Sequence, residues 1–239
     1  ILIRFFYNHA AAKIITVSQS IKEELVKNFR VQEEKILVIR PLFQTEKIEK
    51  MAKKKVTLPL GVRKGRYLVA VGRLSKEKRF PYLLKVFQDL VKQDKKMKLV
   101  IVGEGNEKEN LKKQIRALGL KNNVFLVGGK SNPYPFMKNA FALALTSRTE
   151  GFPRVIVESM VCGTPVVTTN FKGVEEMVKN GQNGLIVSMN KKQELKEAIA
   201  KLFYRPSLRE KLSLEAKKEV FQWDFSVNLK KHEEIFSKL

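Results

Sequence analysis

The sequence contains few of the residues that build disulfides and metal centres. Cys162 is the only cysteine among the 239 residues, which excludes an internal disulfide and a cysteine metal cluster and fits a reducing, cytoplasmic setting. Only three of the acidic residues are aspartates, and no two of them form an Asp-x-Asp pair, so an aspartate metal site of that kind is excluded within this chain. The three aspartates are Asp89, Asp94 and Asp224.

A long apolar run at the start of the chain is also missing. The first seven residues, ILIRFFY, are apolar but too short to span a bilayer, and they lack the cleavage region of a signal peptide. Because the chain begins with Ile1 in place of methionine, we expect an excerpt of a longer protein. Its length suffices for one large domain or two modest ones with a real core.

Acidic residues are scarce beside basic ones: 24 Asp and Glu stand against 47 Lys and Arg, a formal net charge of +23. Three explanations are open, namely solvated lysine-rich helix faces, attraction to anionic lipid headgroups and binding of nucleic acid. The lysines are dispersed and are not interleaved with an aromatic platform, which disfavours nucleic acid. We therefore expect no nucleic-acid partner, and an anionic membrane surface remains a candidate partner.

From Tyr67 onward, short apolar runs alternate with amphipathic stretches. The apolar runs are nearly continuous Val, Ile and Leu, which is typical of strands buried on both faces of a parallel sheet. Strict alternation of strand and helix predicts a doubly wound α/β domain. The expected strands are 67–71, 98–102, 123–127, 141–146, 165–169 and 184–187, and the helical stretches between them are 80–92, 107–118, 133–139, 153–162 and 172–180.

Two domains of unequal completeness are expected. Residues 1–42 are interpreted as the incomplete closing part of a preceding domain, and 43–239 as the main domain, in which the lysine-rich stretch 44–64 serves as a connector. The first part contains a strand, a helix and a strand at 13–18, 21–29 and 35–40, and the main domain ends with helices at 191–204, 207–221 and 226–238.

Loops that follow strands carry the candidate site, because ligands of such sheets bind beyond the carboxyl ends of the strands. Gly72, Arg73 and Lys78 follow the first main strand. The glycine permits a close approach of the backbone to a ligand, while the arginine fork and the lysine charge suit phosphate. A solvated basic turn explains the same residues.

Glycines also follow the next two strands. Gly103 and Gly105 suit a tight turn, but the third glycine of the dinucleotide-binding fingerprint is missing. Gly128 and Gly129 are compatible with a flat base lying against the backbone, and a purely structural turn explains them equally well.

The fourth loop, in the stretch SRTEGFPRVIVESM, contains the two glutamates Glu150 and Glu158. Pro153 fits the first turn of a helix and Gly163 fits just past its end, so Glu150 is expected in the loop before the helix and Glu158 on one of its faces. The first carboxylate could contact a polar ligand at the helix N-terminus, and the second could accept hydrogen bonds from vicinal hydroxyls. The alternative is an ordinary loop charge and an exposed helix charge.

Taken in order, these stretches resemble the retaining glycosyltransferases of family 4, which have the GT-B fold. The resemblance lies in the E-x7-E pair and in residues 72–78, 132–140 and 162–178, and residues 13–29 resemble the closing unit of that fold's acceptor-side domain. It implies an α/β, Rossmann-like doubly wound parallel sheet that forms the C-terminal, nucleotide-sugar-binding half, with a remnant of the N-terminal domain. Arg40-Pro41 and Phe141 depart from the family, where Asn-Pro and Asp are frequent.

The resemblance also implies roles for individual residues. Arg73 and Lys78 would hold the donor diphosphate and stabilise charge on the leaving group, Glu150 would contact the donor sugar, and Glu158 would hold the ribose hydroxyls. No metal and no cofactor are expected, since Arg and Lys supply the positive charge. The further donor-binding residues expected are Gly72, Gly128, Gly151, Phe152 and Val155.

The implied function is transfer of a sugar, with retention, from a nucleotide-diphosphate sugar, by default a UDP-sugar, to a glycan or lipid-linked acceptor. Surface polysaccharide, lipopolysaccharide or glycolipid synthesis on the inner face of the cell membrane would fit, with this chain incomplete by itself. The donor sugar and the acceptor are not specified. A sugar-nucleotide epimerase and a non-catalytic nucleotide-binding subunit are the alternatives, and the intact E-x7-E pair disfavours both.

The remaining unusual residues are expected to be structural. His9 and His232 are single histidines, and Cys162 fits a small buried hydrophobe. Trp223 and Phe225 are expected to anchor the final helix, which in this fold crosses back toward the acceptor-side domain.

Overall fold

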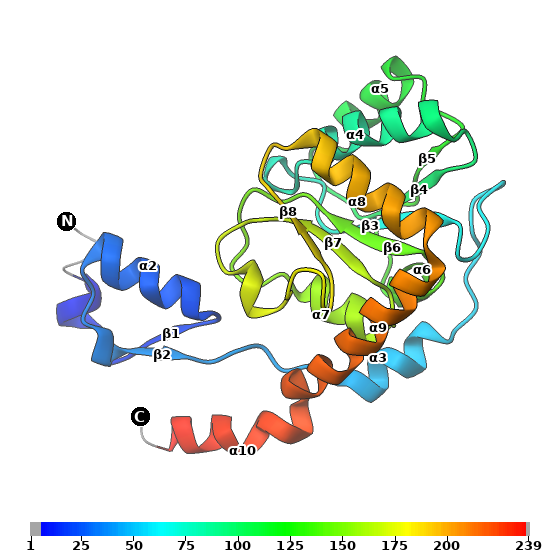
Figure 1. Cartoon of the computed structure of the whole chain (residues 1–239). Helices are drawn as coiled ribbons and strands as arrows, with labels where there is room; N and C mark the ends of the chain where they lie inside the picture. The colour runs from blue at the N-terminus through cyan, green and yellow to red at the C-terminus, as the bar shows by residue number, and fades with distance from the viewer. Residues whose placement is uncertain (1–5, 238–239) are drawn as a thin grey trace.

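A computed structural model describes residues 6–237 (Figure 1). The apolar residues 1–5 and the last position of the final expected helix lie outside the described residues. Within these residues the chain forms two parallel sheets, one of two strands and one of six. In the part of the chain described, no helix is long and apolar enough to cross a membrane.

The small sheet forms a strand–helix–strand unit, as predicted. Strand β1 (Ile14–Thr16) pairs in parallel with β2 (Ile36–Val38), and α2 (Gln19–Phe29) joins them. Ser18 caps α2, since its hydroxyl oxygen accepts a hydrogen bond from the N–H of Ile21. His9 lies on the exposed surface of a short π-helix, Phe6–Ala10 (η1), before β1.

The large sheet has the predicted fold class. Its order is β5-β4-β3-β6-β7-β8 and every pairing is parallel, so the chain starts at the centre, builds one half and then crosses to build the other. This reversal places a topological switch point between β3 and β6. The strands are β3 (Tyr67–Val71), β4 (Lys98–Val102), β5 (Val124–Leu126), β6 (Ala142–Leu145), β7 (Val166–Thr169) and β8 (Leu185–Val187).

Helices cover both faces of this sheet (Figure 1). Successive side chains of β3 enter opposite cores, Leu68 and Ala70 on one face and Tyr67 and Val69 on the other, because side chains alternate along a strand. On the first face lie α4 (Phe80–Gln93), α5 (Lys108–Ala117) and α8 (Lys192–Tyr204); on the second lie α3 (Thr45–Ala52), α6 (Tyr134–Lys138) and α7 (Arg154–Val161); α9 (Pro206–Val220) contributes to both cores.

The prediction of a helix over 172–180 is wrong. The structure has a single 3-10 turn, Val174–Glu176 (η4), which begins after Gly173 at a φ of +86°. The side chain of Asn183 then accepts from the N–H of Lys179 and donates to the carbonyl of Met177, which replaces helical hydrogen bonds. The apolar side chains of this stretch are buried, but the backbone that carries them forms turns and not a helix.

Part of the expected connector is also helical. Helix α3 occupies Thr45–Ala52, and its Ile48 and Ala52 are buried against α6 and α7. The lysines of the following stretch 53–55 are exposed. The many lysines concealed a short helix whose apolar side consists of only a few residues.

The backbone passes between the small unit and the large domain twice, once near Phe43 and once near Trp223. Hydrogen bonds join these two passages. The N–H of Phe43 donates to the carbonyl of Trp223 at 3.0 Å, and the N–H of Phe225 donates to the carbonyl of Phe43 at 2.8 Å. Thr45 donates through its N–H and its hydroxyl to Asp224. Trp223 is buried, which fits the expected anchoring, but the Phe225 side chain is 41% exposed, so the predicted anchoring by Phe225 is wrong.

Helix α10 (Phe225–Phe236) follows this second passage and extends below the small unit (Figure 1). Its His232 lies with Nε2 3.0 Å from the carbonyl oxygen of Arg40 and with Nδ1 2.8 Å from that of Asn228. The histidine therefore connects the last helix to the segment that leaves β2.

Candidate active site

The loops after β3 and β6 meet at the switch point of the sheet. The N–H of Arg148 donates to the carbonyl of Glu77 at 2.9 Å, and the Thr146 hydroxyl donates to the carbonyl of Lys78 at 2.9 Å. Each loop thus fixes the backbone of the other. Both belong to stretches that the sequence singled out.

Lys78 and Glu150 form an ion pair between these loops. The Nζ–Oε1 distance is 2.5 Å, and the Ser147 hydroxyl donates to the same carboxylate oxygen at 2.5 Å. The Lys78 side chain is 20% exposed and that of Glu150 is 12% exposed. A cation and a carboxylate are therefore held in a fixed arrangement at the place where such sheets bind ligands.

Arg73 lies on the same loop as Lys78 and is exposed. Its charge is felt at Glu77, whose pKa is lowered first by a hydrogen bond from Ser75 and further by the charges of Arg73 and Lys76. An exposed guanidinium beside a lysine that is fixed by an ion pair suits the binding of a phosphate group.

Glu158 has different neighbours from Glu150. Its side chain is 16% exposed, and an oxygen lies 3.8 Å from Nε of Arg154, one turn earlier on α7. Burial raises the pKa of Glu158, and Arg154 opposes that shift. The negative charge of Glu158 also raises the pKa values of Tyr134 and Cys162, for which burial is the larger cause. It therefore lies on the side of α7 that faces α6.

The residues after Glu150 serve mainly for packing. The ring of Phe152 lies 5.3 Å from that of Trp223 and 6.2 Å from that of Phe43, and the Val155 side chain is buried in the same core. Their backbone groups lie at the start of α7, where N–H groups lack partners within the helix. The buried Val155 side chain is shielded from a ligand, whereas the Phe152 side chain is only partly buried.

Gly128 lies beyond β5 in a left-handed conformation, with a φ of +76°. Glu104, which follows β4, lies beside it, because a Cβ atom at Gly128 would be 3.0 Å from Oε1 of that glutamate. Hydrogen bonds from Lys108 and from the N–H of Gly129 lower the pKa of Glu104. A carboxylate therefore lies beside this turn, which the sequence did not indicate.

A pocket of about 240 Å³ separates the Glu150 loop from helix α2. A Cβ atom at Gly151 would lie 3.4 Å from Ile21 of α2, so the loop and the helix nearly touch. Lys172 and Glu24 form an ion pair of 3.3 Å and both line this pocket. Ile21, Glu24 and Lys172 were not recognised in the sequence, because their part in the pocket depends on how the small unit sits against the large domain.

Glu176 is the main polar link between the small unit and the large domain. Its carboxylate accepts from the N–H groups of Gln19 and Ser20 at 3.1 and 2.9 Å and from the Arg40 guanidinium at 3.1 Å. A carboxylate is favourable at a helix N-terminus, here that of α2. A Cβ atom at Gly173 would collide with the Ser20 hydroxyl, so the glycine is what permits this approach.

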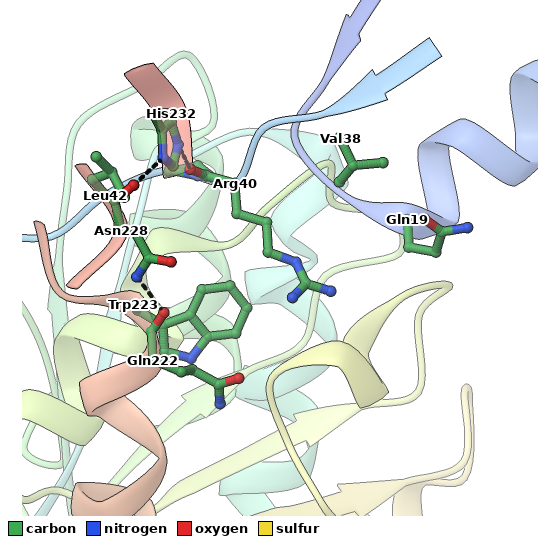
Figure 2. A pocket seen from close by; sticks show the side chains of 9 residues that line it. Gln19, Val38, Arg40, Leu42, Gln222, Trp223, Asn228 and His232 are labelled. Atoms are coloured by element: carbon green, nitrogen blue, oxygen red, sulfur yellow. Dashed lines mark hydrogen bonds between the residues drawn. The ribbon is translucent and has the colours of Figure 1, made fainter. Parts of the chain in front are cut away.

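Arg40 continues this link into a second pocket of about 200 Å³ (Figure 2). Its guanidinium carbon lies 5.2 Å from the centre of the Trp223 ring. In Figure 2 the arginine side chain extends between Trp223 and Gln19, and the His232 ring lies next to the Arg40 backbone. Within residues 6–237, no three His, Cys, Asp or Glu side chains cluster in a way that could hold a metal ion.

Comparison with known sequences identifies related proteins. The family model "Glycosyl transferases group 1" matches residues 59–219. The chain is 31% identical over 212 residues to an N-acetylgalactosamine-N,N'-diacetylbacillosaminyl-diphospho-undecaprenol 4-alpha-N-acetylgalactosaminyltransferase of Campylobacter jejuni, a match that covers 88% of this chain and 56% of the relative. It is 28% identical over 216 residues to the capsular polysaccharide biosynthesis glycosyltransferase CapM of Staphylococcus aureus, covering 88% and 57%.

Solved structures give the same result. HepE of Anabaena in complex with UDP-glucose superposes with a TM-score of 0.85 at 26% identity, over 97% of this chain and 65% of that one. TarM superposes with a TM-score of 0.83 at 22% identity, over 98% and 45%, which bears on the fold alone. The predicted GT-B architecture is confirmed. The chain thus spans little more than half the length of the curated relatives named above, and it belongs to the glycosyl transferases group 1 family.

Proposed function

We propose that this chain is the donor-binding half of a glycosyltransferase that moves a sugar from a nucleotide-diphosphate sugar to a glycan or lipid-linked acceptor. The observation that carries the proposal is the ion pair of Lys78 and Glu150, fixed by Ser147 at the switch point of the sheet and inside the family-matched region. In this division, residues 43–239 bind the donor and residues 1–42 close the acceptor-side domain.

A UDP-sugar is the proposed donor. HepE, which is 26% identical over 95–97% of this chain and 64–65% of its own, has been solved with UDP and with UDP-glucose. In the proposed complex Arg73 and Lys78 contact the diphosphate, Glu158 accepts hydrogen bonds from the ribose hydroxyls, and Gly128 lies beside the base. Glu150, together with the backbone of Gly151, faces the sugar.

The proposed chemistry is substitution at the anomeric carbon with retention. The bond from that carbon to the diphosphate oxygen breaks, a bond to the acceptor hydroxyl oxygen forms on the same face, and the hydroxyl proton is released. The departing diphosphate gains negative charge, which Arg73 and Lys78 stabilise more strongly than they stabilise the ground state. This arrangement needs no divalent cation.

The proposed acceptor is a surface glycan or its lipid-linked precursor. The names of the relatives point in this direction, since one acts on a diphospho-undecaprenol-linked sugar, another is a poly(glycerol-phosphate) alpha-glucosyltransferase and a third acts in capsular polysaccharide biosynthesis. A net charge of +23 supports a peripheral position on the anionic, cytoplasmic face of a membrane. An excess of binding to anionic over neutral vesicles that fades with added salt would support that position.

Thermal unfolding in the presence of nucleotides tests the donor site directly. A ligand that binds only the folded chain raises its melting temperature, so UDP and UDP-sugars should stabilise the protein. The Lys78→Ala variant should lose most of this shift. Lys76→Ala is the matched control, because Lys76 is an exposed cation on the same turn.

Two outcomes would count against the proposal. If no nucleotide or nucleotide sugar changes the melting temperature, the donor site is misassigned. Equal loss of the thermal shift in Lys76→Ala and Lys78→Ala would mean that both lysines belong to a solvated basic turn and that Lys78 has no specific role in binding. Nucleotide binding by a full-length protein that transfers no sugar would favour the non-catalytic subunit instead.

A further inference from the structure

A second basic pocket lies at the amino ends of strands of the large sheet, whereas the Lys78–Glu150 pair lies beyond the carboxyl ends. It is found where strands begin: Arg66 immediately precedes β3 and Lys98 is the first residue of β4. Lys78 and Glu150 lie beyond the carboxyl ends of strands, so the length of the strands separates the two places. The pocket has a volume of about 610 Å³, and its five cationic side chains are Arg63, Arg66, Lys95, Lys96 and Lys98.

These cations are not neutralised by the protein. Among the described residues, no charged side-chain nitrogen of these five lies within 4 Å of a carboxylate oxygen. The one carboxylate that lines the pocket is Asp94, and its oxygens already accept from the N–H of Lys96 at 2.8 Å and from the Tyr204 hydroxyl at 3.1 Å. Lys98 donates to the carbonyl of Asn122 at 2.8 Å, which leaves the other four to face an incoming anion.

Like charges are held close together beside this pocket. The guanidinium of Arg66 lies 5.6 Å from the centre of the buried Phe203 ring. Arg209 donates to the carbonyl oxygens of Leu202 and Phe203, and its pKa is lowered first by burial and then by the charge of Arg66. The two guanidinium groups repel each other, and the charge of Glu210 offsets that repulsion at Arg209 only in part. A multivalent anion in the pocket would relieve it further.

We propose that this pocket binds a phosphate-bearing anion at a site separate from the donor site. Arg63 and Arg66 supply planar forks that can hold phosphate oxygens in pairs, and Lys95 and Lys96 add point charges. Phe203 and Tyr204 form an aromatic wall for the rest of the ligand. The phosphate could belong to a soluble polyphosphate or to a phospholipid headgroup, and the chemistry of recognition is the same. The inference does not depend on the proposed glycosyl transfer.

Titration calorimetry with inorganic pyrophosphate tests the site on the whole chain. The pocket variant combines Arg63→Ala, Arg66→Ala and Lys96→Ala, all exposed side chains. The control combines Lys27→Ala, Lys47→Ala and Lys50→Ala, exposed lysines of α2 and α3 that change the net charge by the same amount. We expect at least a tenfold loss of affinity in the pocket variant and less than twofold in the control, because hydrogen bonds to charged groups are the stronger ones.

Two further measurements separate the sources of phosphate and the two sites. Sedimentation with phosphatidylglycerol vesicles, compared with phosphatidylcholine vesicles, detects a headgroup; loss of that binding in the pocket variant alone assigns the site to lipid even where pyrophosphate binds weakly. Lys78→Ala should leave pyrophosphate binding to the pocket intact. Equal losses in the pocket and control variants, or a loss confined to Lys78→Ala, would overturn the proposal.

Discussion

The charges of Lys78 and Glu150 compensate each other. Both side chains are largely buried, and their loops follow different strands of the sheet. Removing one member of a buried pair leaves the other charge without a partner, which costs far more than the intact pair contributes. We expect Lys78→Ala to lower the free energy of unfolding by about 3 kcal/mol in urea titrations.

A double variant provides the control for this prediction. Combining Lys78→Met with Glu150→Gln removes both charges, so much of the lost stability should return. If the effects of Lys78→Met and Glu150→Gln, each measured alone, simply add in the double variant, the ion pair is not coupled and the expected loss of about 3 kcal/mol is wrong. Sugar transfer by a full-length protein should remain absent in the double variant even where the fold has recovered.

Glu158 is expected to make stability depend on pH. Its pKa is raised above the ordinary 4.5 by burial, so the folded chain holds this proton more tightly than the unfolded chain does. The resulting stabilisation is fully present below about pH 4.5 and is lost as pH rises through the raised value. Glu158→Gln should therefore be at least as stable as the parent at pH 7, yet bind UDP about tenfold more weakly through loss of a charged acceptor.

The measurement pairs urea unfolding at pH 4 and pH 7 with UDP titrations. Glu23→Gln on the exposed side of α2 serves as the control. A Glu158→Gln variant that is destabilised equally at both pH values, or that binds UDP as the parent does, would remove Glu158 from the proposed ribose site.

The sequence predicted the residues of the candidate site but not the contacts between them. Arg73, Lys78 and Glu150 could be predicted because the end of each Val- and Ile-rich strand marks the ligand side of the sheet. The contact between Lys78 and Glu150 joins positions 72 residues apart, which no local pattern records. Glu176 was missed for the same reason, since the helix N-terminus that it caps is 156 positions away.

At the scale of elements, strands were predicted better than short helices. The runs at 67–71 and 98–102 match β3 and β4 residue for residue, because a strand buried on both faces has an unmistakable composition. The stretch 172–180 failed because Val174, Met177 and Val178 have helical spacing while Gly173 and Asn183 impose turns. Helix α3 escaped notice because two buried residues among lysines and glutamates carry little periodicity.

The attachment of α2 through Glu176 is a testable property of an element. Glu176→Ala removes the acceptor of two backbone N–H groups and of the Arg40 guanidinium. Hydrogen bonds to charged groups contribute about 1.5–3 kcal/mol each. We expect the amides of Gln19 and Ser20 to exchange with deuterium at least tenfold faster in Glu176→Ala, while the central strands keep their protection.

Glu175→Ala is the matched control, because Glu175 is exposed and precedes Glu176 directly. Its exchange pattern should equal that of the parent. Faster exchange across the whole large sheet in Glu176→Ala would mean that the glutamate supports the domain core and not the seating of α2.

For the molecule as a whole, the proposal predicts binding without turnover. Residues 43–239 contain the proposed diphosphate, ribose and sugar contacts, while the small unit offers a single helix opposite Glu150. Positioning of two reactants contributes about 7–11 kcal/mol to catalysis, and an open cleft provides little of it. We expect UDP to bind this chain in the micromolar to millimolar range, with no sugar transfer to lipid acceptors from a radiolabelled donor. Transfer at the rate of a full-length protein would show that the acceptor site lies within this chain.

The joined passages of the backbone also give the protein an optical reporter. Trp223 is the only tryptophan, is 2% exposed and lies in one passage, while Arg40 of the other lies over its ring. Its emission should therefore be that of a shielded indole. A rotation of the small unit would have to turn about these passages, shifting Arg40 and altering both the colour and the intensity of the light. If donor binding rotates the small unit, the fluorescence of Trp223 would report that binding without any attached dye.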